Sequence, residues 1–144
     1  MKTLAIFTLC LCAFVVQGAD LARQNSTDAI RFAALSMIES GDNDITIGPD
    51  GEISRYQILP EIWRKYTKLP LSEAANPVAA LNVARAIMSD RMSRFSNLQF
   101  SSFKPQQFYL LWHRPARLFA AHYPSLITAR EAGRAQRFAN LCEK

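Results

Sequence analysis

The amino-acid sequence predicts a mainly α fold of five or six helices, with one small β-hairpin after the first helix of the domain. Apolar residues recur every three or four positions in several stretches, which is typical of amphipathic helices. Proline or a capping residue stands before most of these stretches, where helices usually begin. A single β-prone stretch surrounds the turn sequence Gly48-Pro-Asp-Gly51, which predicts the hairpin.

The first predicted helix begins near Ser26 or Thr27, either of which can cap a helix start. Its apolar stripe follows the spacing i, i+3, i+4, i+7 and i+8, which predicts a buried face formed by Ile30, Ala33, Ala34, Met37 and Ile38. A neighbouring stripe, at the edge of that face, carries Phe32, Leu35 and Glu39. Gly41 is expected to end the helix, which leaves Glu39 in its last turn.

Glu39 is the candidate general acid. Partial burial disfavours the carboxylate anion, and the negative end of the helix dipole lies nearby. Both effects raise the pKa, as a general acid working near neutral pH requires. The alternative interpretation is an ordinary surface glutamate that precedes a glycine C-cap.

The predicted hairpin pairs Ile45–Ile47 with Ile53–Gln57. Side chains alternate along a strand, so Glu52, Ser54 and Tyr56 are expected to share one side. Tyr56 and Gln57 provide a ring and an amide, which suit stacking on a sugar and hydrogen bonding to its hydroxyls. Packing of Tyr56 on the core is an equally open interpretation, and one side chain can do both.

The remaining helices are predicted from proline positions and apolar spacing. They follow Pro60 (61–66), begin at Asn76-Pro77, span Pro105 to His113, and run from Pro124 to about Cys142. The last helix also carries a basic line formed by Arg130, Arg134 and Arg137. This line predicts a solvated face or a patch for anionic groups of a ligand.

Residues 1–18 have the pattern of a signal peptide: charged Met1-Lys2, an apolar stretch, and small residues before a cut after Gly18. We therefore expect export to a periplasmic or extracellular location, with residues 19–144 as one domain and no membrane-spanning segment after cleavage.

Removing Lys2 with the signal peptide leaves sixteen Lys and Arg against twelve Asp and Glu, a net charge of about +4. Cys142 is then the only cysteine, so no internal disulfide is expected, and the histidine spacing predicts no metal or cofactor. No basic run with interleaved aromatics indicates nucleic acid.

The motif Glu39-Ser-Gly-x-Asn43, followed by Gly51 and Gln57-Ile58-x-Pro60, resembles the soluble lytic transglycosylase domain of the lysozyme-like superfamily. The resemblance covers about two dozen residues and follows the family spacing without a gap. It implies a lysozyme-like fold, Glu39 as the catalytic acid and Gln57 as the glutamine that closes the motif. Tyr56 stands where the family usually has methionine. Ser54 replaces a family glycine, which implies a narrower or differently shaped groove.

The resemblance continues into the helix that ends at His113. There the family places an aromatic-Asn turn that lines the saccharide groove. This chain is one residue shorter and lacks the Asn and the Gly, so Trp112 and His113 would take the aromatic and Asn places. Trp112 as a core residue, with His113 at the helix end, is the other open interpretation.

Three functions are consistent with these residues, all with peptidoglycan strands as the partner. The first is a lytic transglycosylase that uses Glu39 alone. The second is an inverting hydrolase in which Asp50 or Glu52 activates water, with the two carboxyl groups roughly 6.5–9.5 Å apart. The third is a glycan-binding relative that has lost turnover. The sequence does not predict an oligomeric state.

Overall fold

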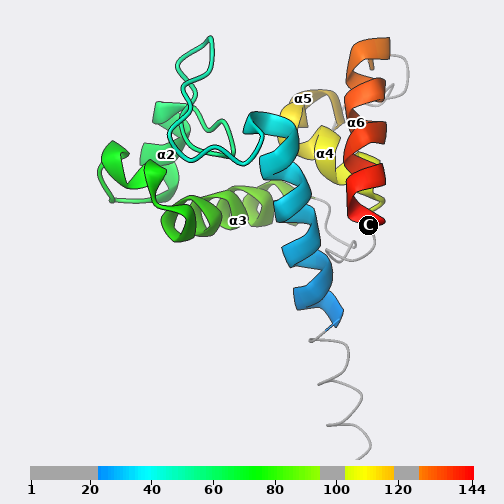
Figure 1. The fold of residues 1–144 in the computed structure, drawn as a ribbon, viewed down its shortest axis with the longest axis horizontal. Coiled ribbons are helices and arrows are strands. Elements are labelled where there is room, and N and C mark those ends of the chain that lie inside the picture. Colours follow the sequence, from blue (N-terminus) through cyan, green and yellow to red (C-terminus); the bar gives the residue numbers. More distant parts are fainter. Residues whose placement is uncertain (1–22, 95–102, 119–126) are drawn as a thin grey trace, which may run out of the picture.

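The protein is described by a computed structural model over residues 23–94, 103–118 and 127–144 (Figure 1). It is mainly helical, as the sequence predicts. The predicted signal peptide (1–18) lies outside the described residues. So do residues 96–102, whose sequence predicts a loop. None of the described helices is long and apolar enough to cross a membrane.

A helix over residues 23–40 comes first and is followed by an irregular segment over residues 41–59. The helices after it are α2 (Pro60–Tyr66), α3 (Pro77–Ser93), α4 (Pro105–His113), α5 (Pro115–Leu118) and α6 (Ala129–Cys142). A short 3₁₀ helix, η1 (Leu71–Ala75), precedes α3, whereas the sequence around Pro70 predicts a loop there. In Figure 1 the 23–40 helix runs between α3 on one side and the α4–α6 pair on the other.

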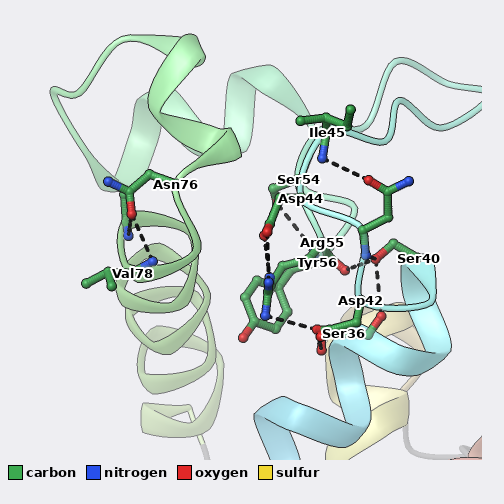
Figure 2. A network of polar contacts seen from close by, with 12 residues as sticks. Ser36, Ser40, Asp42, Asp44, Ile45, Ser54, Arg55, Tyr56, Asn76 and Val78 are labelled. Carbon is green, nitrogen blue, oxygen red and sulfur yellow. Dashed lines mark hydrogen bonds and ion pairs between the residues drawn. The ribbon is translucent and has the colours of Figure 1, made fainter.

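The helix starts follow from their first residues. Pro60, Pro77 and Pro105 each occupy the first turn of their helix, where a missing N–H costs nothing. The Asn76 side chain caps α3 by accepting from the N–H groups of Val78 and Ala79 (Figure 2). The sequence prediction for α6 was too long at its start. The described helix begins at Ala129, and Pro124 lies outside the described residues.

The buried face of the 23–40 helix differs from the prediction. Ile30 and Met37, two members of the predicted stripe, are about half exposed. The stripe that carries Phe32 and Leu35 is buried instead. Phe32 makes edge-to-face contacts with Tyr56 and with Phe108 of α4, so the large aromatic ring fixes which face of the helix turns inward. Glu39 lies on this stripe and is turned inward with it.

The structure does not confirm the predicted β-hairpin. The turn at Gly48–Gly51 is present, with the Gly51 N–H donating to the Gly48 carbonyl (3.1 Å). Beyond it, only isolated antiparallel bridges join Ile53 to Ile47 and to Ile58. Ser54 and Gln57 have φ values of 68° and 51°, and the Gln57 N–H donates to the Ser54 carbonyl. This second turn replaces the extended backbone that a paired strand needs.

A polar network fastens the irregular segment to the end of the 23–40 helix (Figure 2). Ser36 Oγ donates to Asp42 (2.7 Å), and Ser40 Oγ donates to the Arg55 carbonyl (2.9 Å). The Arg55 guanidinium binds both Asp42 and Asp44. Gly41 has a φ of 67°, a conformation that suits glycine and turns the chain out of the helix directly after Glu39 and Ser40.

Candidate functional site

A cavity of about 430 Å³ lies where the 23–40 helix, the irregular segment and the helices that follow them meet. The end of the 23–40 helix contributes Glu39, and the irregular segment contributes Asp50, Glu52 and Gln57. The α3 and α6 helices add one arginine each, and the end of α4 adds a short run that continues into α5. The residues from these helices include Arg91, Arg134, Trp112, His113, Arg114 and Pro115.

Glu39 is the carboxyl group buried most deeply at this cavity, with a side chain that is 8% exposed. Its Oε2 accepts a hydrogen bond from Arg134 Nη2 at 3.3 Å, and the same nitrogen donates to the Ile38 carbonyl. Its Oε1 is buried and has no hydrogen-bond partner among the described residues, and the same holds for the Tyr109 hydroxyl. One carboxylate oxygen is therefore held by a cation while the other is not.

The pKa of Glu39 is raised above its ordinary value. Burial is the largest cause because it disfavours the anion, and the negative charge of Glu52 acts in the same direction. The charge of Arg134 and the Tyr109 hydroxyl act against them and lower the pKa, but burial prevails. A protonated Glu39 is thus favoured to a higher pH than an exposed glutamate would allow.

Glu52 and Gln57 converge over Gly48. A Cβ atom at position 48 would overlap both the Glu52 carboxylate and the Gln57 amide oxygen, so a larger residue there would displace these two side chains from their present positions. Glu52 Oε2 accepts from the Asp50 N–H (2.9 Å), and Gln57 Nε2 donates to the Ser54 carbonyl (3.1 Å). The turn therefore presents a second carboxylate and an amide at the cavity that Glu39 lines.

The end of α4 is held in place by Arg91 of α3. Its Nη1 donates to the carbonyls of Leu111 and Trp112, which are among the last of the helix and lack partners within it. The Arg91 guanidinium also lies over the Trp112 ring, 5.2 Å from its centroid. Burial lowers the pKa of Arg91. Trp112 is mostly buried, with its ring near Tyr56 on one side and Arg91 on another, yet it lines the cavity.

The structure brings together most of the residues singled out in the sequence. Glu39, Gln57, Trp112 and His113 line one cavity, as do both candidate second carboxylates, Asp50 and Glu52. Tyr56 and Ser54 do not line it. Tyr56 is 3% exposed and packs against Phe32 and Trp112, so its ring belongs to the core. Ser54 is buried within the second turn, where its positive φ is the conformation a glycine would favour.

Sequence reasoning missed several residues at this site. Tyr109 precedes His113 by one helical turn, and their ring centroids lie 5.7 Å apart in a stacked arrangement. The i, i+4 spacing of these two residues on a predicted helix is a sequence signal for this contact. The sequence predicts that Arg134 belongs to a basic line that faces solvent or binds anionic groups of a ligand. Arg130 and Arg137 are exposed as a solvated face requires, whereas Arg134 is 24% exposed and paired with Glu39. No local pattern indicates that Arg91 would reach the end of α4.

The sequence matches no protein-family model, no curated protein and no solved structure. The chemistry of the cavity is therefore the basis for inferring function. The described residues contain no group of three His, Cys, Asp or Glu side chains arranged to hold a metal ion. What the cavity offers is a shielded carboxyl group that can exchange a proton, with an indole, an amide and several guanidinium groups around it.

Proposed function

We propose that this protein is an exported enzyme that cleaves peptidoglycan as a lytic transglycosylase, with Glu39 as its only acid and base and with a lysozyme-like fold. The observation that carries the proposal is the setting of Glu39: a buried carboxyl with a raised pKa, in the last turn of a helix, beside a cavity lined by Gln57 and Trp112. The sequence motif around Glu39 resembles that of the transglycosylase domain. The cavity and the motif are independent arguments for the same residue.

In the proposed reaction, protonated Glu39 donates its proton to the oxygen that links N-acetylmuramic acid to N-acetylglucosamine, and the bond from this oxygen to the muramyl C1 breaks. The Glu39 carboxylate then takes the proton of the muramyl C6 hydroxyl. That oxygen bonds to C1 and closes a 1,6-anhydro ring. Glu39 ends the cycle protonated, and no water is consumed. One carboxyl group therefore suffices.

The burial of Glu39 and its partial pairing suit both half-reactions. Burial favours the protonated state that the first step needs. Arg134 stabilises the carboxylate that remains after the proton has left, because its guanidinium already lies 3.3 Å from Oε2. Trp112 offers an apolar edge for a sugar ring, and Gln57 offers hydrogen-bonding groups for its hydroxyls.

A second candidate function is an inverting hydrolase. It is supported by the position of Glu52 and Asp50 at the same cavity and by the effect of the Glu52 charge on the pKa of Glu39. In this reaction the second carboxylate would activate a water molecule while Glu39 protonates the leaving oxygen. The product would carry a reducing end in place of the anhydro ring.

Digestion of purified sacculi, followed by mass spectrometry of the released fragments, tests these functions. Anhydromuramyl ends are expected, with activity lost in Glu39→Gln and retained in Glu52→Gln and Asp50→Asn. Reducing ends, lost in Glu52→Gln or Asp50→Asn, would support the hydrolase instead. Intact sacculi that still retain the wild-type protein would indicate a glycan-binding protein without turnover. Circular dichroism of each variant establishes that it is folded.

A further inference from the structure

Arg114 is held at the cavity in a fixed pose. It is the C-cap residue that follows α4, and Pro115 begins α5 directly after it. Its N–H donates to the Leu110 carbonyl (2.8 Å), which fixes its backbone. Its side chain is 51% exposed, and its Nε donates to Glu131 Oε1 at 3.1 Å. An exposed guanidinium is thus anchored through its Nε at a cavity that Glu39 also lines.

The anchor of Arg114 is itself fixed. Glu131 is mostly buried and forms the capping box of α6 with Thr128. The N–H and the hydroxyl of Thr128 both donate to Glu131 Oε2, at 2.9 and 2.8 Å. Oε1 of the same carboxylate accepts from Arg114. A helix cap therefore sets the orientation of the Arg114 side chain before any ligand binds.

The terminal nitrogens of Arg114 are left for a ligand. Neither Nη1 nor Nη2 makes a hydrogen bond with any described residue. In contrast, Nη1 of Arg91 donates to two carbonyls at the end of α4, and Nη2 of Arg134 donates to the Ile38 carbonyl and to Glu39. Two parallel N–H groups on a planar guanidinium match the two oxygens of a carboxylate. An arginine oriented beforehand binds such a group with less loss of conformational entropy than a free side chain.

We propose that Arg114 binds a carboxylate carried by the substrate. This inference rests on the proposed function, which identifies the carrier as the lactyl arm of a muramyl residue. The carboxylate is either that of the lactyl group itself, in strands without peptide, or that of the attached peptide. Arg114 would select strands that carry muramic acid over neutral polymers of N-acetylglucosamine.

Binding of soluble glycan strands tests the proposal. Dissociation constants are measured for peptide-bearing strands, for strands stripped of peptide by an amidase, and for both after carbodiimide amidation of their carboxylates. The proteins are the wild-type sequence, Arg114→Gln and Arg64→Gln, each also carrying Glu39→Gln so that the strands are not cleaved during the measurement. Arg64 is exposed on α2 and does not line the cavity, so its substitution removes the same charge without removing a cavity residue.

Amidation is expected to weaken binding to the wild type and to Arg64→Gln about tenfold, because one charge-assisted pair is lost. Arg114→Gln is expected to bind unmodified strands about tenfold more weakly, with no further loss on amidation. If the effect of amidation depends on Arg114 in strands without peptide, the bound carboxylate is that of the lactyl group. If it depends on Arg114 in peptide-bearing strands, the bound carboxylate belongs to the peptide. Arg114→Lys, which keeps the charge but loses the planar fork, is expected to restore only part of the affinity.

Two results would overturn the inference while leaving the proposed function intact. The first is that the wild type cleaves the strands, but amidation of their carboxylates does not weaken binding. The other is an equal loss in Arg114→Gln and Arg64→Gln, which would indicate a general charge effect. A wild-type protein that neither binds nor cleaves any strand would overturn the proposed function, and this inference with it.

Discussion

At the scale of single residues, Glu39 is subject to opposing influences on its pKa. Burial and the charge of Glu52 raise the pKa, while Arg134 and the Tyr109 hydroxyl lower it. Burial is the strongest of these influences, so the folded protein holds the Glu39 proton more tightly than an unfolded chain does. This difference has consequences for stability as well as for chemistry.

Glu39→Gln is expected to be more stable than the wild type at neutral pH. The pKa of Glu39 in the folded protein lies above 4.5, the ordinary value that applies to the unfolded chain. In the pH window between these two pKa values, the folded protein binds more protons than the unfolded chain. The stability of the wild type therefore falls as pH rises through this window. Glutamine does not titrate, so the advantage of the variant grows across the window and is constant above it. Urea unfolding at a series of pH values measures this difference, with Glu61→Gln on α2 as a control. A difference that shrinks with rising pH would contradict the account.

Tyr109→Phe is expected to raise the pKa of Glu39 further, because it removes a hydroxyl that lowers it. The Tyr109 hydroxyl lies close enough to Glu39 to lower its pKa, yet it makes no hydrogen bond of ordinary geometry with any described residue, so its loss is expected to cost little stability. NMR titration of the Glu39 carboxyl measures the effect directly, and the alkaline limb of the pH–activity profile should move in the same direction. Tyr56→Phe, a change in the core outside the cavity, is the control. A fall in the pKa, or an equal shift in both variants, would argue against the assigned role of Tyr109.

At the scale of elements, the ends of helices build the cavity. Glu39 comes from the last turn of the 23–40 helix, Trp112 and His113 come from the last turn of α4, and Arg114 follows directly. Unsatisfied carbonyl groups are a general feature of helix ends. Here Arg91 satisfies those of Leu111 and Trp112 from a different helix.

Arg91→Met is expected to destabilise the protein by about 1–3 kcal/mol, because two carbonyl groups at the end of α4 lose their charged donor. Trp112 also loses the cation over its ring, so its fluorescence is expected to change. Chemical denaturation and emission spectra measure both effects, and Trp112→Phe identifies the signal. Arg64→Met is the matched control at an exposed helical position. Equal stability losses in the two arginine variants would show that the contacts of Arg91 contribute nothing.

Asn76→Ala is expected to cost about 1 kcal/mol, because the first turn of α3 loses the side chain that accepts from two of its N–H groups. Asn82, exposed in the middle of α3, provides the contrast. Asn82→Ala is expected to leave stability unchanged or to increase it slightly, because alanine is the better helix former. Urea midpoints measure both changes. A loss in Asn82→Ala as large as that in Asn76→Ala would remove the capping argument.

The elements also show which features the sequence can predict. Proline and asparagine mark the starts of α2, α3 and α4 correctly, because their effects are local. The buried face of the 23–40 helix was predicted wrongly, because apolar spacing alone does not tell which of two adjacent stripes meets Phe108. The contact between Glu39 and Arg134 joins residues 95 positions apart, and a single sequence contains no signal for it.

At the scale of the whole molecule, the cavity exists only because three regions of the chain meet. The 23–40 helix brings Glu39, the irregular segment brings Glu52 and Gln57 over Gly48, and the helices α3, α4 and α6 bring the cations and Trp112. The acid, the amide and the indole are each held by contacts within the fold. Such a preorganised site favours chemistry by positioning its groups before the substrate arrives.

Digestion of sacculi in water labelled with heavy oxygen tests most directly the claim that Glu39 alone performs the reaction. We expect anhydromuramyl fragments that carry no label, because the C6 hydroxyl of the substrate and not water attacks C1. Folded Glu39→Gln is expected to release none of these fragments. Labelled reducing ends, or undiminished cleavage by Glu39→Gln, would contradict the account.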